Sequence, residues 1–185
     1  KSRFSYLKLQ YTFKSCKMKK ITPRRQAMTK DEFYMGKAIE EAKKAAAIGE
    51  IPIGAVIIYK KKAVARAHNL RETLPSATAH AEILAIEEAC RVLNRWRLTD
   101  CTLYVTAEPC PMCAGAVVNS RLDRIVYGCP DPKGGGTRSL YTIVEDERLN
   151  HRAEVTAGVR AAECADLLKN FFQKRRADNT KTVSE

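Results

Sequence analysis

The sequence predicts an α/β layered domain in which a mixed sheet is flanked by helices. Two observations carry this prediction. Strand-like and helical patterns alternate along the chain, which is typical of layered folds with crossover connections. The chain is also 185 residues long and 45% hydrophobic. That is enough for one domain to bury a hydrophobic core without disulfide bonds.

The first expected element is a helix within residues 28–50. Thr29 and Glu32 have the spacing of a capping box, and Gly49 marks the helix exit. Two strands follow, in "IPIGAVIIYK" and "KAVARAH", separated by a basic turn.

The second half of the chain alternates in the same way. "TAHAEILAIEEACRVL" has helical spacing, "CTLYVTA" is a strand, and "PMCAGAVVNS" is a short helix with Pro111 suited to its first turn. "RIVYGC" is a further strand that ends in the loop "PDPKGGGTRS". "GVRAAECADLLKNFFQKRR" closes the domain as an amphipathic helix.

The net charge of +12 is unevenly distributed. Residues 1–27 hold nine Lys and Arg and no acid, so the charge alone is weak evidence for a nucleic-acid partner. We expect a basic N-terminal extension (1–27) that is disordered or non-native, a folded domain (28–176) and a polar C-terminal tail (177–185). No apolar run reaches the roughly 18 residues of a membrane-spanning helix, so we expect no membrane partner.

The seven cysteines are odd in number and have no disulfide-framework spacing. No segment has the pattern of a secretory signal, so we expect thiols in a reducing, cytoplasmic setting. In that setting the CxxC of "PCPMC" is either redox-active or metal-binding. A redox motif is expected in a thioredoxin-like unit near the start of its domain, whereas Cys110 and Cys113 lie deep in the chain, which favours metal binding.

A third ligand is available upstream, where "HAE" opens a helix with His80. Two successive α/β units can bring the two helix starts together, so that one His and two Cys form a set that suits zinc. Three protein ligands leave a fourth position for water, as in a catalytic site. A structural site would need a fourth protein ligand, and the candidates are Cys101, Cys129, His68 and His151.

Glu82 is the expected acid/base group. Positions i and i+2 of a helix point in different directions, so Glu82 is not expected to be a ligand beside His80. A carboxylate near a zinc-activated water can take its proton and return it to a leaving group. The alternative is that Glu82 is only a first-turn acid that stabilises the helix dipole.

The motifs together resemble the tRNA-specific adenosine deaminases of the bacterial TadA family, over nearly all of residues 28–176. The matching stretches are "PIGAV", "HNLRET", "AHAEILAI", "WRL", "TLYVTAEPCPMCAGAVV", "RIVYG", "DPKGG", "LNHR" and "FFQKRR". H-x-E with P-C-x-x-C is the general signature of zinc deaminases. The order of the other motifs is more specific.

This resemblance implies a three-layer α/β/α cytidine-deaminase-like fold with a mixed, mostly five-stranded sheet. It implies hydrolytic deamination of adenosine to inosine at the wobble position (34) of a tRNA anticodon, typically of an arginine tRNA. The implied cofactor is one zinc ion per chain, held by His80, Cys110 and Cys113 with Glu82 as the proton shuttle. The implied partners are a tRNA anticodon stem-loop and a second copy of the chain in a homodimer, with no DNA expected.

The resemblance also implies substrate-binding residues, and simpler roles remain open for some of them. Asn69 matches a pocket asparagine, although it could be only a strand-end turn residue. The remaining implied contacts with RNA are Asp131, Lys133, Phe172, Arg175 and Arg176. For Phe171 a core-facing position is expected instead.

Two other functions remain open. One is a small-molecule deaminase that acts on guanine, cytosine or a deoxynucleotide such as dCMP. The other is a zinc-stabilised RNA-binding module without catalysis.

Overall fold

The computed structural model describes residues 27–182, and side chains as far as residue 178. Apart from residue 27, the predicted N-terminal extension lies outside the described residues. The elements in chain order are α1 (Lys30–Ala47), β1 (Gly54–Tyr59), β2 (Lys62–His68), α2 (Ala81–Leu93), β3 (Cys101–Ala107), α3 (Pro111–Asn119), β4 (Arg124–Cys129), the 3₁₀ turn η1 (Ile143–Glu145), β5 (Glu154–Ala157) and α4 (Ala161–Thr182).

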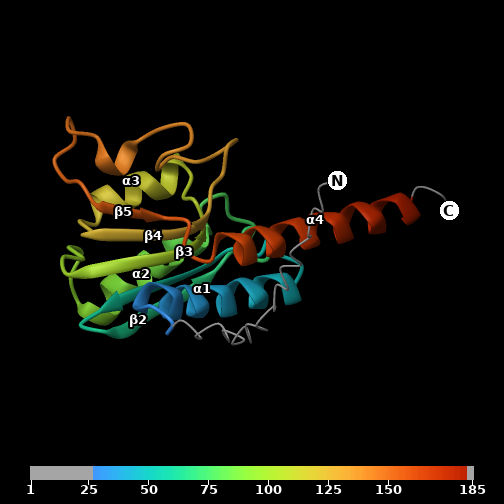
Figure 1. The fold of residues 1–185 in the computed structure, drawn as a ribbon, viewed down its shortest axis with the longest axis horizontal. Coiled ribbons are helices and arrows are strands. Elements are labelled where there is room, and N and C mark those ends of the chain that lie inside the picture. Colours follow the sequence, from blue (N-terminus) through green and yellow to red (C-terminus); the bar gives the residue numbers. More distant parts are fainter. Residues whose placement is uncertain (1–26, 183–185) are drawn as a thin grey trace, which may run out of the picture.

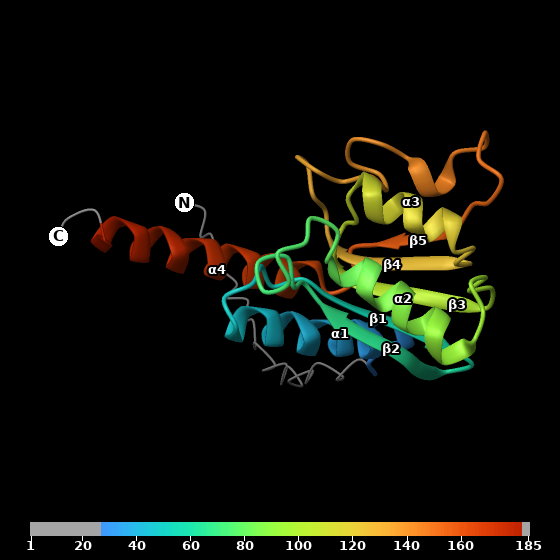
Figure 2. The ribbon, with the colours of Figure 1, turned by 180° about the vertical axis from the view of Figure 1, so that it is seen from behind.

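The five strands form one mixed sheet in the order β2-β1-β3-β4-β5. β1 pairs antiparallel with both β2 and β3, whereas β3, β4 and β5 are parallel to one another. Helices cover both faces, with α1 on one side and α2 on the other (Figures 1 and 2). The predicted α/β class and the mixed five-stranded sheet are therefore confirmed.

Alternate residues of the central strands build two separate cores, because successive side chains of a strand point to opposite faces. The core beneath α2 and α3 includes Ala55, Ile57, Leu103, Val105 and Ile125. The core beneath α1 and α4 includes Met35, Ile39, Val56, Tyr104, Val126 and Cys164. The central strands β1, β3 and β4 are buried on both faces, which explains their nearly continuous apolar sequences.

The ends of α1 follow the prediction. The Thr29 side chain accepts from the Glu32 amide, and the Glu32 carboxylate accepts from the Thr29 amide, so the capping box is complete. At the other end, Gly49 has a φ of 83°, which permits a left-handed turn. The Gly49 amide donates to the Ala46 carbonyl and the Glu50 amide to the Ala45 carbonyl, so a Schellman motif closes the helix.

Two features differ from the elements expected along the chain. The fifth strand, β5, is only four residues long and its residues are exposed or partly buried, so it carries no strong strand pattern. The last helix begins at Ala161 rather than at residue 158, because Gly158 has a φ of 83°, and it continues to Thr182 instead of ending at Arg176. α4 projects beyond the body of the domain (Figure 1).

The described part of the chain contains six cysteines, and all six are free thiols. No helix within the described residues is both long enough and apolar enough to cross a membrane.

The contact between α1 and β1 depends on a glycine, which yields a first prediction. A Cβ on Gly54 would lie 2.1 Å from the Ala38 carbonyl oxygen and 2.4 Å from the Ala42 nitrogen. Because both obstacles are backbone atoms, Gly54→Ala must push the helix away from the sheet. We expect it to lower the free energy of unfolding by about 2–3 kcal/mol, measured by urea denaturation.

Gly115→Ala is the matched control, since a Cβ on Gly115 in α3 meets nothing within 4 Å. Alanine is favoured over glycine inside a helix, so this variant is expected to unfold at the same urea concentration or a higher one. Equal destabilisation by both variants would contradict the packing argument.

Candidate active site

Two helix N-termini meet above the sheet and bring the predicted ligands together. His80 is the N-cap residue of α2 and Cys110 is the N-cap residue of α3, both with extended backbone. Neither side chain caps its own helix, so each is available for a contact outside it. Cys113 lies one turn further into α3, on the side that is fully buried.

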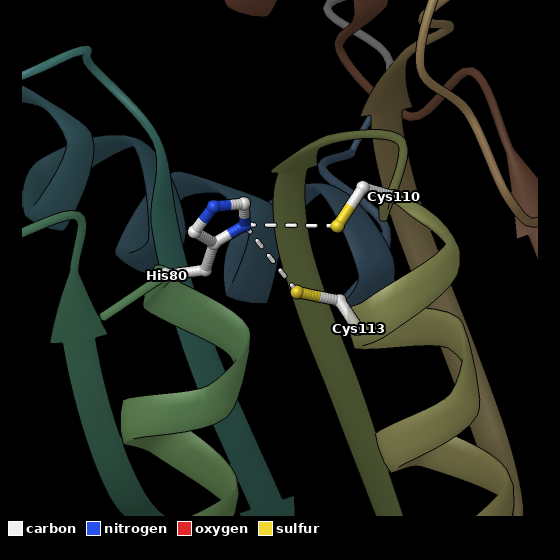
Figure 3. A group of neighbouring side chains, drawn as sticks. All are labelled: His80, Cys110 and Cys113. Atoms are coloured by element: carbon white, nitrogen blue, oxygen red, sulfur yellow. Dashed lines mark hydrogen bonds between the residues drawn. The ribbon is translucent and has the colours of Figure 1, made fainter. Parts of the chain in front are cut away.

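The three side chains form a compact group of donor atoms. The Nδ1 atom of His80 lies 3.7 Å from the Cys110 sulfur and 3.6 Å from the Cys113 sulfur. All three donor atoms are within 4.8 Å of one another, a spacing that can hold a metal ion. Figure 3 shows the imidazole facing both sulfurs across the gap between the helices.

The electrostatics of this group favour a thiolate. The hydrogen bond from the Cys113 thiol, together with the one from His80, lowers the pKa of Cys110 to about 4. The same contact with Cys110 raises the pKa of Cys113, and burial adds to this effect. The hydrogen bond to Cys110 raises the pKa of His80. Since thiolate is the form that ligates a metal, the group is partly prepared for a cation.

Glu82 lies beside the group without belonging to it. Its side chain is only 3% exposed, and burial raises its pKa. Its Oε2 atom is buried and has no hydrogen-bond partner. A solvated first-turn acid would show neither property. A buried carboxyl with a raised pKa is suited to take up a proton and to give it back.

None of the four residues considered as a fourth ligand joins the group among the described side chains. His68 contacts Glu41 at 3.3 Å, and the Nε2 atom of His151 donates to the Leu122 carbonyl at 2.7 Å. The Cys129 thiol donates to the Thr106 carbonyl, and Cys101 is buried in the core beneath α2 and α3. The arrangement is thus that of three ligands rather than a closed four-ligand clip.

Asn69 lies on the segment that runs alongside His80. It directly follows β2 and is 3% exposed, and its neighbour Leu70 donates a backbone hydrogen bond to the carbonyl of Ala79. The Asn69 side chain donates from Nδ2 to the carboxylate of Glu50 at 2.8 Å. It is therefore a fixed, buried amide and not a solvated turn residue.

Glu108 was missed by the sequence analysis, although it holds the loop of residues 130–140 that follows β4. Its carboxylate accepts from the backbone amides of residues 131, 137, 138 and 139 and from the Ser139 hydroxyl. Burial alone would raise the pKa of Glu108, but these hydrogen bonds outweigh it and lower the pKa. The only sequence signal was an acid directly before the "PCPMC" turn.

This loop packs directly on the ligand turn. The Gly136 amide donates to the Pro109 carbonyl at 2.7 Å. Within the loop, Asp131 accepts from the amides of Lys133 and Gly134, so it shapes the turn, while the Lys133 side chain is exposed. The structure therefore brings the predicted "DPK" residues to the same edge as Cys110.

Three predicted RNA contacts, Phe172, Arg175 and Arg176, lie in the second half of α4. Phe172 is 39% exposed and makes an edge-to-face contact with the partly buried Phe171. Arg175 lines a hollow between the end of α1 and α4, together with Ala46, Gly49, Phe171, Lys174 and Asp178. Arg176 is exposed on the same helix. Gly49, which lines this hollow, directly precedes Glu50, the residue that accepts from the Asn69 side chain.

Comparison with known sequences gives consistent matches. The chain matches the MafB19-like deaminase family over residues 29–176. It is 56% identical over 149 residues to a tRNA-specific adenosine deaminase of Bacillus subtilis (strain 168), covering 80% of this chain and 92% of that protein. It is 45% identical over 149 residues to one of Haemophilus influenzae, covering 80% and 86%.

Comparison with solved structures agrees. A structure from biochemical and structural studies of A-to-I editing by tRNA:A34 deaminases at the wobble position is 40% identical, with a TM-score of 0.71 over 74% of this chain and 99% of that one. A guanine deaminase from Bacillus subtilis is 39% identical, with a TM-score of 0.52 over 54% of this chain and 64% of that one.

The loop on the ligand turn gives a second prediction. A Cβ on Gly136 would lie 2.6 Å from the Pro111 nitrogen and 2.8 Å from the carbonyl carbon of Cys110. Gly136→Ala must therefore displace the backbone that carries Cys110. We expect metal affinity to fall about tenfold or more, measured by competition with a chromophoric chelator.

Gly134→Ala is the control in the same loop. Its Cβ would meet only the end of the Asp131 side chain, at 2.8 Å from Oδ2, and that side chain can move aside. We expect metal affinity close to that of the unaltered protein. An equal loss of affinity in both variants would show that the loop, and not the Gly136 contact, is responsible.

Proposed function

Because the chain belongs to the tRNA-specific adenosine deaminase family, we infer that it converts adenosine to inosine at the wobble position of a tRNA. The observation that carries this conclusion is the donor group of His80, Cys110 and Cys113 beside the buried Glu82, in a chain 56% identical to a tRNA-specific adenosine deaminase. The reaction adds one water to the adenine ring and releases one ammonia.

We propose that the metal is zinc, one ion per chain. One imidazole nitrogen and two sulfurs, one of them with a lowered pKa, are the donors that zinc prefers. The buried Oε2 atom of Glu82 has no hydrogen-bond partner among the protein groups. A water bound to the metal would supply one, so this oxygen also fits a metal site. When bound, zinc supplies a Lewis acid that lowers the pKa of a water molecule.

Glu82 then moves the protons. Its carboxylate takes a proton from the water that adds to C6 of adenine, and returns a proton to the amino group that leaves as ammonia. Burial raises the pKa of Glu82, so its protonated form is more accessible near neutral pH than that of a solvated glutamate. This balance suits a group that must both accept and donate.

The substrate contacts are proposed from position and chemistry. The wobble base must be splayed out of the anticodon loop to reach a recessed site. Asn69 would hydrogen-bond the flipped nucleoside, and Asp131 and Lys133 would contact the flanking nucleotides from the loop over Cys110. Phe172, Arg175 and Arg176 would contact the RNA from α4, since aromatic and basic side chains suit stacking and phosphate binding.

We further propose that the deaminase domain comprises residues 28–176. We propose that the enzyme acts in the cytoplasm, where an RNA substrate of this kind is expected. We also propose that it is a homodimer. Large apolar side chains exposed on α3 and on the segments that flank η1 support the dimer, since exposed apolar surface marks interfaces. They are Met112, Leu140, Tyr141 and Leu149.

A second candidate function is deamination of a free purine base. It is favoured by the 39% identity to a guanine deaminase, which however covers only 54% of this chain. A free-base enzyme needs no phosphate contacts, so its activity should be nearly independent of salt. An enzyme that binds an RNA backbone should weaken as salt rises, because phosphate contacts release counterions.

The deciding experiment uses an anticodon stem-loop with adenosine at the wobble position, beside a loop with the adenosine one position away. The purified zinc protein is incubated with each, and inosine is measured by nuclease digestion and mass spectrometry over a salt series. We expect inosine only in the wobble loop, with less at high salt. Conversion of free guanine, with no inosine in either loop, would establish the second candidate instead.

A further prediction concerns Glu82. Glu82→Gln keeps the volume of the side chain but cannot carry the proton, so the rate of inosine formation should fall by roughly 10²–10⁴-fold. Zinc content, measured by atomic emission, should stay at one per chain because Glu82 is not among the ligating atoms.

Glu87→Gln on the exposed side of α2 is the control for loss of a charge on the same helix. It should retain full activity. Full activity of Glu82→Gln would remove Glu82 from the proton transfers, whereas loss of zinc from Glu82→Gln would assign it to the metal site.

A further inference from the structure

Glu50 has a role in the site that none of the motifs indicates. We propose that Glu50 is a positioning residue which holds the Asn69 amide in one of its two orientations, and so decides that Asn69 displays an acceptor oxygen to the nucleoside. This inference rests on the proposed function, in which Asn69 contacts the substrate.

The two oxygens of the Glu50 carboxylate have separate partners. Oε2 accepts from Nδ2 of Asn69 at 2.8 Å. Oε1 accepts from the backbone amides of Glu72 at 2.9 Å and Thr73 at 2.7 Å. Glu50 is 1% exposed, so these three donors replace the hydrogen bonds to water that the carboxylate loses on burial. One oxygen therefore holds the loop, and the other holds the amide.

The local sequence places Glu50 at this point. The left-handed Gly49 turns the chain at the end of α1, and the Glu50 amide closes the Schellman motif by donating to the Ala45 carbonyl at 3.0 Å. The carboxylate thereby lies under the loop that joins β2 to α2. The same loop is tied to the ligand segment by the hydrogen bond from Leu70 to Ala79, next to His80.

The chemistry of the pair fixes the orientation of the amide. An ionised carboxylate only accepts hydrogen bonds, so the NH₂ group of Asn69 must face Glu50. The Asn69 backbone is also anchored, since its amide donates to the Ile53 carbonyl at 3.0 Å. The carbonyl oxygen of the side chain is left as the group to be offered to a substrate N–H or O–H. Without Glu50 the amide could turn over and offer a donor instead.

Glu50→Gln separates the two tasks of the carboxylate. The new amide can keep its carbonyl oxygen toward the amides of Glu72 and Thr73, which preserves the loop. Its NH₂ group then opposes the NH₂ group of Asn69, and Asn69 must turn over to be satisfied. The substitution should therefore reverse the hydrogen bonding that Asn69 displays, with little effect on folding.

The double substitution E50Q/N69D provides the rescue. In it the amide at position 50 donates to the carboxylate at position 69, whose other oxygen again offers an acceptor to the substrate. N69D alone sets two carboxylates against each other at hydrogen-bond distance, which is unfavourable. The double variant should thus be more active than either single variant, a pattern that a merely structural role of Glu50 would not produce.

The measurement is kcat and KM on the wobble stem-loop, with zinc content and thermal unfolding recorded for each variant. We expect Glu50→Gln to lose about tenfold or more in kcat/KM, because a substrate donor then meets a donor. The double variant should recover to within about threefold of the unaltered enzyme. Glu72→Gln, a change of an exposed side chain in the same loop, is the control and should be unchanged.

The outcomes are distinct. Normal activity of Glu50→Gln, or a double variant no better than the single ones, would overturn the inference. If the unaltered enzyme converts free guanine and not the stem-loop, the proposed function fails. The same five proteins are then compared on guanine, where rescue by the double variant upholds the Glu50 inference and its absence overturns it.

Discussion

The convergence of two helix N-termini on one group of donor atoms is the constraint on which the rest of the structure depends. His80 and the two cysteines come from segments thirty residues apart, yet their atoms meet at 3.6 and 3.7 Å. This depends on α2 and α3 packing on the same face of the sheet, where α3 connects the parallel neighbours β3 and β4. The apolar central strands stabilise this arrangement, because helices pack on both of their faces and hold the sheet in place.

Two buried carboxylates fix the loops on either side of the site. Glu50 holds the loop before His80, and Glu108 holds the glycine-rich loop over Cys110. In each case the carboxylate accepts from backbone amides that the loop cannot pair with itself, and buried amides must find a partner. On each side of the site, one acidic side chain thus fixes a loop that forms part of its wall.

A feature of this site could be predicted from the sequence when the residues that form it are close together in the chain. The capping box, the Gly49 exit and the ligand residues at helix starts are local patterns, and the structure has them where they were expected. Glu50 and Glu108 had no such signal, because their partners lie up to 31 residues away and many are backbone atoms, which leave no trace in residue type. The resemblance implied a fifth strand, but no segment was assigned to it for a related reason: a short edge strand is specified by its pairing with β4 rather than by its own sequence.

The distribution of hydrogen bonds among buried carboxylates gives an independent argument for the role of Glu82. Four carboxylates in the described part of the chain are at most 4% exposed, namely Glu41, Glu50, Glu82 and Glu108. Glu41 contacts Lys44 and His68, and Glu50 and Glu108 have partners on both oxygens. Only the Glu82 carboxylate keeps a buried oxygen without a partner.

An unpaired buried acceptor costs about 1–3 kcal/mol, and a domain is stable by only about 5–15 kcal/mol. The fold satisfies three of its buried acids, and it could have satisfied the fourth by the same means. Among the described residues it leaves a buried carboxylate oxygen open only beside the ligand group, where a bound water would be its partner and where proton transfer requires such an oxygen.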